Sequence, residues 1–367
     1  MAKLPEFCNV QYGYAFDSAC FTEDSTFIPL VRIRDVKRGY SETFYSGSYS
    51  ADYVIDNGSL LVGMDGEFNI AKWEGGKALL NQRVCRITTR KNVDEEYIRF
   101  ALTKALKEIE NRTSFVTVKH LSAKELNNLE LCLPSYADQM LISGVLTNIE
   151  KIIAIRQQQL QKLDDLVKAR FVELFGSCKR MTSMNELCSI ITDGTHQPPK
   201  FQSNGIPFIF VSNLVKNTIT YNAEKFISEE TYGELYKRTP IEVGDLLLST
   251  VGSYGHPAVV AEDRKFLFQR HIAYLKPKHD IVNSFYLHAA LLSPGGQGQI
   301  EEKVKGVAQK TLNLSEIKKI LVPLPSIEEQ NAFEAFVKQT DKLRNAIQKT
   351  LNETQLLYDS LMWRYFG

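Results

Sequence analysis

The chain contains one short phrase twice, and this repeat limits the possible folds more than any other feature. The stretch "LCLPSYADQ" (131–139) is matched by "VPLPSIEEQ" (322–330), 191 residues later. At the same offset the match extends without a gap over 119–176 and 310–367, which is more than fifty residues. Two unrelated helices rarely agree over such a length, so we interpret the match as an internal duplication. The chain is therefore predicted to contain two similar structural units.

Apolar residues follow the repeated phrase at alternating spacings of three and four. In the first copy they are Ile142, Leu146, Ile149, Ile153, Leu160, Leu163, Val167, Phe171 and Leu174. The second copy repeats the pattern more loosely, with Phe333, Val337, Leu343, Ile347, Leu351, Tyr358, Leu361 and Tyr365. Such spacing is typical of a coiled-coil seam. We predict two long helices, over 134–178 and 325–367, each a rod of about 60 Å.

The order of the parts predicts how the two helices pack. The first helix leads into the second globular block and the second helix leads out of it. If the two seams pack on each other, the helices must be antiparallel, and an approximate two-fold axis relates the blocks at their opposite ends. This arrangement also brings Met1 close to Gly367. The predicted fold class is α+β, with two β-rich domains separated by a pair of long antiparallel coiled-coil helices and related by an internal pseudo-two-fold repeat.

The two globular blocks, over 1–133 and 179–324, contain matching strand-like runs. Thus "NGSLLVGMDGEF" (57–68) resembles "VGDLLLSTVGSY" (243–254), and "LNQR" (80–83) resembles "LFQR" (267–270). Short apolar runs bounded by glycine and polar residues predict strands and turns. One or two helices accompany them in each block, at 94–110 and 283–292.

Composition indicates a cytoplasmic globular protein. Hydrophobic residues make up 44% and charged residues 24% of the 367 positions. No apolar run approaches the roughly 20 residues that cross a bilayer, and the start "MAKLPEFCNV" has no signal-peptide apolar core. The six cysteines are scattered and the six histidines form no metal-binding pattern, so we expect reduced thiols and no metal site.

The charge balance argues against an independent nucleic-acid-binding protein. The net charge is +1. Residues 1–133 carry 17 basic and 18 acidic side chains, and residues 179–324 carry 17 and 14. A strongly basic footprint is therefore missing. Any contact with DNA must come from local patches or be shared with a partner.

No catalytic signature is present. The chain lacks the glycine motifs that cradle phosphates and the Gly-x-Ser-x-Gly elbow of hydrolases. The stretch "QPPK" (197–200) faintly resembles the loop with which amino-methyltransferases hold a flipped base. Gln197 and Lys200 replace that loop's amide-bearing Asn or Asp and its aromatic residue, and no cofactor-binding motif accompanies them, so we reject a catalytic role.

Two polar loops are candidate DNA contacts. The stretch 35–53 mixes cations with aromatic residues and hydroxyls, and its candidates are Lys37, Arg38, Tyr40, Tyr45 and Tyr49. Cations suit phosphates, and aromatic or hydroxyl groups suit sugars and base edges. The Pro-stiffened stretch 193–202 offers Thr195, His196, Gln197 and Lys200, and Gln is a natural reader of adenine. The first stretch is equally compatible with a solvated loop, and the second with a rigid connector.

Two glycine-bearing turns supply the remaining candidates. They lie at 64–71 and 250–257, and we expect Phe68, Asn69, Tyr254 and His256 to be exposed there. The glycines alone are explained by turns that need positive φ. Arg83 and Arg270, each preceded by Gln, are expected to make internal polar contacts rather than to bind DNA.

The chain resembles the specificity subunits of Type I restriction-modification systems. The resemblance rests on the repeated phrase that starts each long helix and the Phe-Gly pair that ends it. It also rests on a glycine turn opening each block, at Tyr12-Gly13 and Asp193-Gly194, and on "GDLLLSTVGSYG" (244–255). It covers essentially the whole chain. The extra terminal helix of some members is expected to be absent.

The resemblance implies a function in DNA recognition. In that family each recognition domain reads one half of a split DNA sequence through the major groove, and the helices set the gap. The subunit itself is not catalytic and binds no cofactor. Two methyltransferase subunits dock on it and use S-adenosylmethionine to methylate adenine, and restriction/translocase subunits use ATP and magnesium to cut unmodified DNA. The expected partners are therefore double-stranded DNA and these two kinds of subunit, and no membrane.

Two other functions remain open. A related subunit could serve a methylation-only complex or another phage-defence complex. A more distant alternative is a coiled-coil adaptor that does not bind DNA and whose β-rich blocks bind peptides or glycans. Adenine methylation at a split motif, in a complex with a methyltransferase, separates the first from the second.

Overall fold

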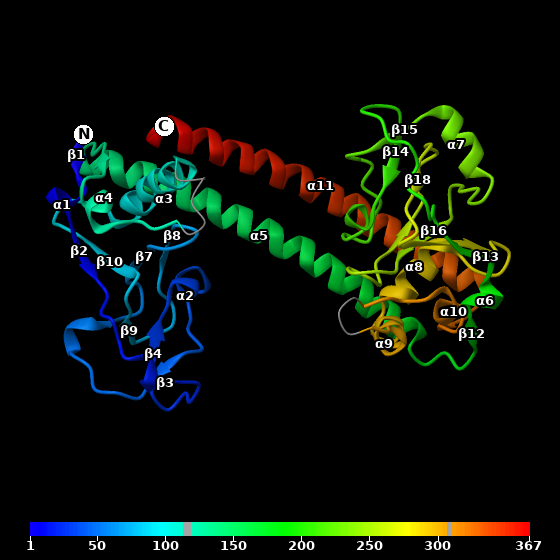
Figure 1. The fold of residues 1–367 in the computed structure, drawn as a ribbon, viewed down its shortest axis with the longest axis horizontal. Coiled ribbons are helices and arrows are strands. Elements are labelled where there is room, and N and C mark those ends of the chain that lie inside the picture. The colour runs from blue at the N-terminus through cyan, green and yellow to red at the C-terminus, as the bar shows by residue number, and fades with distance from the viewer. Residues whose placement is uncertain (113–118, 307–309) are drawn as a thin grey trace. The chain divides into compact units, whose positions relative to one another are not determined.

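The structure, a computed structural model, describes residues 1–112, 119–306 and 310–367. These residues form two compact units, which are described separately (Figure 1). Unit 1 comprises Met1–Arg156 and Thr350–Gly367, and unit 2 comprises Gln157–Lys349.

Two long helices supply parts of both units. Helix α5 runs over Tyr136–Phe175 and helix α11 over Ile327–Phe366, and each contains 40 residues. The two long helices predicted from the repeat are therefore present, and each begins two residues after the predicted start. Each unit combines one globular block with a part of each helix.

The globular block of unit 1 contains two main sheets. A four-stranded antiparallel sheet has the order β2-β10-β7-β8, and a five-stranded sheet has the order β3-β5-β4-β9-β6. The strands are β1 (Ala2–Lys3), β2 (Cys8–Tyr12), β3 (Phe21–Thr22), β4 (Ile28–Val31), β5 (Phe44–Tyr45), β6 (Val54–Ile55), β7 (Leu60–Gly63), β8 (Asn69–Lys72), β9 (Ala78–Leu80), β10 (Val84–Thr89) and β11 (Glu130–Leu131). The helices are α1 (Leu4–Phe7), α2 (Ile33–Arg38), α3 (Glu95–Arg112) and α4 (Ala123–Asn127).

Unit 2 repeats this plan. Its four-stranded antiparallel sheet has the order β13-β19-β16-β17, and a three-stranded sheet has the order β15-β14-β18. The strands are β12 (Met181–Ser183), β13 (Cys188–Asp193), β14 (Ile206–Ile209), β15 (Phe226–Ile227), β16 (Leu246–Ser249), β17 (Pro257–Val259), β18 (Leu267–Phe268), β19 (Ile272–Pro277) and β20 (Leu321–Pro323). The helices are α6 (Met184–Leu187), α7 (Glu229–Tyr236), α8 (Ser284–Leu292), α9 (Pro294–Lys303) and α10 (Leu314–Ile317).

The pairing of strands shows that the two blocks are copies. In both, the second sheet holds one parallel pair, β4 with β9 in unit 1 and β14 with β18 in unit 2. In both, a two-stranded antiparallel ribbon, β1-β11 or β12-β20, joins the first strand of the block to the strand before a long helix. The predicted helices at 94–110 and 283–292 correspond to α3 and α8.

The repeated phrase is a helix start combined with a buried anchor. The hydroxyl of Ser135 accepts a hydrogen bond from the backbone N–H of Asp138 at 3.2 Å, and that of Ser326 accepts one from Glu329 at 3.3 Å. These bonds satisfy N–H groups that the first turn of a helix leaves without a partner. The Gln that ends each phrase, Gln139 or Gln330, is buried.

Within unit 1 the two long helices are antiparallel. Leu146 packs with Met362 and with Phe100 of α3 in one buried cluster. Four residues further along α5, the Glu150 carboxylate accepts a hydrogen bond from the Tyr358 hydroxyl at 3.0 Å. A step forward along α5 is thus a step backward along α11, as the duplication predicts.

Unit 2 contains a second antiparallel contact between the same helices. Phe171 and Phe175 pack against Phe333, with ring centroids 5.7 and 5.6 Å apart. The carboxylate of Asp164 forms an ion pair with Arg344 further along the helices. Here too, the residue number falls on α11 as it rises on α5.

The predicted seam is wrong at two positions. Leu174 and Leu343 are exposed, at 42% and 52%. Phe175 and Thr340 are buried instead, and the Phe175 ring packs against Phe333 of α11 and Tyr286 of α8. The hydroxyl of Thr340 donates to the backbone carbonyl of Phe336 at 3.0 Å, which allows a polar side chain to be buried at the seam.

Met1 and Gly367 line the same pocket in unit 1. The pocket measures about 920 Å³ and also receives Ala101 and Ala105 of α3 and Leu131 of β11. The expectation that the two termini lie close together is therefore confirmed.

Candidate nucleic-acid interface

Four loop segments meet in each globular block, and we call this meeting point the loop junction. In unit 1 the segments are 13–14, 64–66, 81–84 and 119–121. The backbone N–H of Met64 donates to Arg83 at 2.9 Å, and that of Leu121 donates to the carbonyl of Met64 at 2.7 Å. The N–H of Tyr14 donates to Leu80 at 3.0 Å. Backbone hydrogen bonds thus tie together segments that lie far apart in the sequence.

The loop junction of unit 2 contains the same backbone hydrogen bonds. The N–H of Thr250 donates to His271 at 2.9 Å, and that of Leu312 donates to Thr250 at 2.8 Å. The N–H of Thr195 donates to Phe268 at 3.0 Å. The two junctions therefore share one backbone frame.

A glycine is required at the start of each junction. A Cβ on Gly13 would collide with the carbonyl oxygen of Asn81, and one on Gly194 would collide with the carbonyl oxygens of Phe268 and Gln269. Only a residue without a side chain lets the two backbones approach so closely. This explains the glycine turn that opens both blocks.

The hydrogen bonds also correct the correspondence between the blocks. Leu80 and Phe268 accept the equivalent bonds from Tyr14 and Thr195. It follows that Arg83 corresponds to His271, whereas the matching of "LNQR" with "LFQR" pairs it with Arg270. The sequence alignment is wrong here by one residue. It pairs Leu80 with Leu267, whereas the hydrogen bonds make Leu80 equivalent to Phe268.

The junction of unit 1 carries an exposed polar cluster of Asp65, Arg83 and His120. The Arg83 Nε lies 3.5 Å from Asp65 Oδ2, and the His120 Nδ1 lies 2.5 Å from Asp65 Oδ1. The Arg83 Nη1 lies 3.2 Å from both ring nitrogens of His120. The side chains of Arg83 and His120 are 50% and 45% exposed. Arg83 therefore makes the internal contact expected of it, and the cluster also presents it to solvent.

Sequence reasoning did not identify Asp65 or His120. They are 55 residues apart, and a β-bridge between their backbones brings them together only in the folded chain. The corresponding positions in unit 2 are Val251 and Thr311, which form the equivalent bridge. The pKa of His271, which corresponds to Arg83, is lowered by burial and by the charge of neighbouring Arg270. The two junctions therefore present different chemistry on the same frame.

Of the candidate DNA contacts in 35–53, four are exposed and one is buried. Lys37 and Arg38 lie in the last turn of α2, and their side chains are 71% and 45% exposed. Tyr40 and Tyr49 are also exposed. Tyr45 is buried against Phe16, Leu30 and Leu79, so its selection as a DNA contact is corrected to a core residue. Its position on β5 turns the ring inward.

In unit 2 the loop that follows β13 keeps most of its candidates in solvent. His196, Gln197 and Lys200 are exposed, and Thr195 is partly exposed. The carboxylate of Asp193 lies 2.8 Å from His196 Nε2 and 2.8 Å from Arg238 Nη2. Asp193 thus holds an imidazole and a guanidinium beside the Pro-stiffened loop.

The glycine-bearing turns are less exposed than expected. Phe68 is buried in the core of unit 1, which corrects its selection as a surface residue. Asn69 is half-buried and donates from Nδ2 to the backbone of Glu67 at 3.0 Å. Both side chains turn back onto the block because β8 begins at Asn69.

The corresponding residues of unit 2 have internal partners. The Tyr254 hydroxyl donates to Glu301, whose carboxylate also pairs with Lys310 at 2.8 Å. The hydrogen bond from Lys310 lowers the pKa of Glu301. His256 Nδ1 lies 2.9 Å from Asn217 Oδ1, and burial lowers the pKa of His256. Tyr254 and His256 are only partly exposed.

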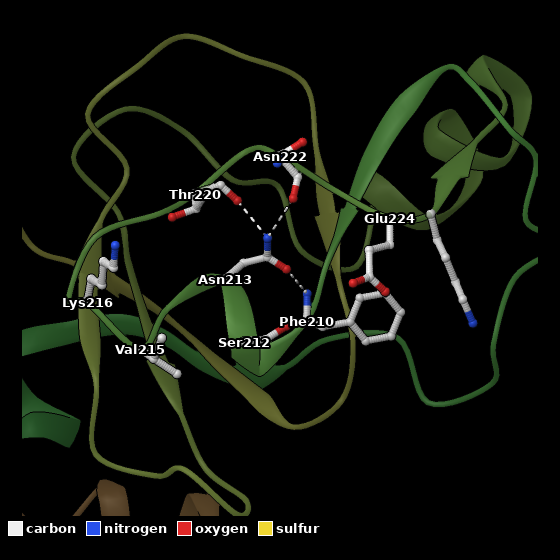
Figure 2. Close-up of a pocket in the computed structure, with 9 residues that line it drawn as sticks. Phe210, Ser212, Asn213, Val215, Lys216, Thr220, Asn222 and Glu224 are labelled. Atoms are coloured by element: carbon white, nitrogen blue, oxygen red, sulfur yellow. Dashed lines mark hydrogen bonds between the residues drawn. The ribbon is translucent and has the colours of Figure 1, made fainter. Parts of the chain in front are cut away.

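A pocket of about 540 Å³ lies in unit 2 beside the segment after β14 (Figure 2). Asn213 lies at its centre, where its Nδ2 donates to the carbonyls of Thr220 and Asn222 and its Oδ1 accepts from the N–H of Phe210. The amide is therefore fully used in holding the loop. Lys216, Glu224 and Lys225 also line the pocket, and the Lys225 ammonium lies over the rings of Phe201 and Phe210, 4.8 and 5.7 Å from their centroids.

In the part of the chain that the structure describes, no group of three or more His, Cys, Asp or Glu side chains is arranged to hold a metal ion. Over the same residues, no helix combines the length and apolar character needed to cross a membrane.

Comparison with known proteins identifies the relatives of this chain. The sequence model of the family described as "Type I restriction modification DNA specificity domain" matches residues 1–165 and 181–354. The Type I restriction enzyme EcoBI specificity subunit of Escherichia coli is 32% identical over 95% of this chain and 81% of its own length. The MjaVIII specificity subunit of Methanocaldococcus jannaschii is 19% identical over 80% of this chain and 74% of its own.

A solved structure shows the same fold. The crystal structure of the Type I restriction-modification S subunit from M. genitalium matches with a TM-score of 0.60 and 13% identity. The match covers 100% of this chain and 95% of that one. The α+β architecture with two repeated domains and two long helices is therefore that of a known class of structures.

Proposed function

This chain belongs to the family of Type I restriction modification DNA specificity domains, and we propose that it acts as the specificity subunit of such a system. Each recognition domain reads one half of a bipartite sequence in double-stranded DNA. The domains are proposed to be residues 1–133 and 179–324, with the spacer helices over 134–178 and 325–367. The helices fix the gap between the two half-sites.

The observation that carries this proposal is the pair of loop junctions. Their backbone hydrogen bonds are the same, whereas the side chains on them differ, with Asp65, Arg83 and His120 replaced by Val251, His271 and Thr311. Side chains on base edges specify sequence. Two domains that recognise different half-sites need different side chains on the same arrangement of backbone hydrogen bonds, which is what the two loop junctions provide.

The charge pattern favours shared DNA binding. Many exposed cations have an acidic neighbour, as Lys37 has Glu67 at 3.5 Å and Arg238 has Asp193 at 2.8 Å. Phosphate neutralisation supplies much of the affinity of a protein for DNA. A subunit with a net charge of +1 is therefore expected to need a partner that contributes further cations.

Apolar side chains left exposed on the long helices support a docking role. In unit 1 they are Met140, Leu141, Val145, Ile152, Ile155, Leu356, Leu357 and Trp363, and in unit 2 they are Leu166, Val172, Leu174 and Leu343. Such side chains at helical spacing suit a partner helix. We assign the exposed apolar side chains of each unit to the docking of one of two methyltransferase subunits, with restriction/translocase subunits joining the complex.

The chemistry is assigned to those partners. The chain itself is proposed to be non-catalytic and to bind no cofactor. S-adenosylmethionine is used by the methyltransferase subunits, and ATP and magnesium by the restriction subunits. The cytoplasm, where DNA and these cofactors are found, is the proposed compartment.

The test is co-expression with a neighbouring methyltransferase gene, followed by purification and genome-wide mapping of methyladenine. The expected result is a stoichiometric complex and methylation at one split motif, which requires this chain. A complex that methylates without cutting would assign it to a methylation-only system. Absence of both complex and methylation would favour the adaptor function and reject the proposal.

A further inference from the structure

The cluster of Asp65, Arg83 and His120 is not needed to form the loop junction. In unit 2 the same backbone bonds form around Val251, His271 and Thr311, which carry neither the carboxylate nor the guanidinium. All three members are replaced together while the frame persists. The cluster is therefore a feature added to the surface of the first domain rather than part of its scaffold.

The backbone at Arg83 supports a specialised role. Its φ is +70°, in the left-handed region, whereas His271 is not among the non-glycine residues with positive φ in the described chain. An L-residue with a side chain adopts this conformation at a cost of about 1 kcal/mol or more. Backbone strain of this kind is concentrated at functional sites, so its presence at an exposed arginine favours a functional role for the Arg83 side chain.

The Asp65 carboxylate lies beside the Nε of the Arg83 guanidinium. Its Oδ2 is 3.5 Å from Nε, and His120 approaches Nη1. Among the described residues, Nη2 of Arg83 donates no hydrogen bond. Arg has five N–H donors in a fixed planar fork. Both terminal nitrogens of the guanidinium, Nη1 and Nη2, therefore keep N–H groups that can donate. Two such donors side by side bind O6 and N7 of guanine in the major groove.

We propose that Arg83 reads a guanine in the half-site of the first recognition domain and that Asp65 positions its guanidinium. This inference rests on the proposed function. It adds the base that is recognised and the residues responsible. Arg83 contacts the base and sets specificity, whereas Asp65 acts through Arg83 and is a positioning residue.

The experiment compares methylation maps of the complex formed by the full chain and its methyltransferase partner. Arg83→Gly is the principal variant, because glycine accepts a φ of +70° without strain and so removes the side chain without disturbing the turn. One guanine position in one half-site should become degenerate, with discrimination lost by about 10- to 100-fold. The other half-site should be unchanged.

Three further variants define the roles. Arg83→Lys should also relax that position, because an ammonium cannot make the bidentate contact. Asp65→Asn should relax the same position only, and Asp65→Glu should restore part of the discrimination, which a purely structural residue would not do. Arg270→Ala is the matched control, an exposed arginine of unit 2 that should leave the first half-site unchanged.

The outcomes separate this inference from the proposed function. If the native complex methylates a split motif and Arg83→Gly leaves every position intact, the inference is overturned. It is also overturned if methylation falls equally at all sequences, since that result identifies a phosphate contact. If the native complex methylates no split motif, the proposed function itself fails. A native thermal melting profile for Arg83→Gly confirms that the comparison concerns a folded subunit.

Discussion

The side-chain oxygen of Gln139 accepts a hydrogen bond from the backbone N–H of Asp94 at 2.9 Å, and this bond ties the start of α5 to the start of α3. Gln330 makes the equivalent bond to Asn283 at 2.8 Å, at the start of α8. Each Gln also donates from Nε2 to the carbonyl of the proline in the repeated phrase. The phrase is thus repeated because each copy fastens a long helix to its own globular block.

Removing either anchor should destabilise the chain. Gln139→Ala and Gln330→Ala each leave buried polar groups without a partner, at a cost of about 1–3 kcal/mol. Denaturant unfolding measures the loss. Gln355→Ala is the control, because the exposed Gln355 bonds only Asp359 among the partners described, at 3.0 Å, and should change stability by less than about 0.5 kcal/mol. Equal losses in all three variants would contradict the anchoring role.

Lengthening both helices should lengthen the DNA gap. Seven residues inserted near Arg156 and seven near Ile347 fall between the pairs Glu150–Tyr358 and Asp164–Arg344. A heptad preserves the seam, and adds about 10 Å, which is about 3 base pairs of DNA. Methylation mapping should show the same two half-sites further apart. An unaltered gap would refute the role of the helices as a spacer, and insertion in only one helix should abolish methylation by breaking their register.

The exposed cations of α2 should contribute to affinity rather than to sequence choice. The ion pairs of Lys37 and Arg38 are exposed and weak, so phosphates can replace the carboxylates. Lys37→Ala combined with Arg38→Ala should weaken binding of the complex to DNA and make its salt dependence shallower by about 1–2 phosphate contacts. Lys124→Ala, which removes one exposed cation from α4, is the control and should change the salt dependence by no more than one contact. A changed motif with unchanged salt dependence would show that these residues read bases instead.

Residues Gln197 and Lys200 of unit 2 are predicted to act on the other half-site. Both are exposed, and Gln is suited to adenine. Gln197→Ala with Lys200→Ala should lower methylation at targets that carry the second half-site and relax its base preference, with no loss of folding. Methylation that is unchanged in rate and sequence would remove this loop from the interface.

Much of this architecture was predictable from the sequence, because the duplication repeats local signals. The Ser cap of each phrase and the heptad spacing act through residues three or four positions away, so both long helices could be predicted. The contacts of Gln139 and Gly13 with distant segments could not. The exposure of single side chains was less predictable. Tyr45 and Phe68 resemble surface aromatics in the sequence, yet both are buried, since the register of a short strand decides which face a residue occupies.

The polar cluster of the first domain shows a second limit. Asp65 and His120 meet across a bridge between distant segments. His271 is identified as the residue of unit 2 equivalent to Arg83 by its backbone hydrogen bonds, not by sequence similarity. Only the tertiary structure reveals that an arginine and a histidine occupy equivalent places. A comparison of residue identities does not detect a position that changes its residue while keeping its backbone hydrogen bonds.

Acid should destabilise unit 2. Burial lowers the pKa values of His256 and His288 below their ordinary value of 6.5, so the folded chain binds fewer protons than the unfolded chain between that value and the folded pKa values. Stability is therefore complete above about pH 6.5 and declines as the pH falls through this window. Unfolding free energies at pH 7.5 and 5.5 measure the effect. His288→Gln should flatten the dependence, and His279→Asn, at an exposed site, should retain it. A steeper dependence in His288→Gln would contradict the assignment.

Met1 and Gly367 face the same pocket, so a chain in which these two residues are linked and new ends are opened elsewhere could adopt the same fold. In unit 2 the polypeptide runs directly from Gly176 to β12, through the place that corresponds to the break between Gly367 and β1. A short peptide bridging that break, with new ends opened after Gly176, would give a circularly permuted chain with the same hydrogen bonds. The consequence is testable within unit 1, where such a linked chain should keep the fold of the block around the pocket of Met1 and Gly367.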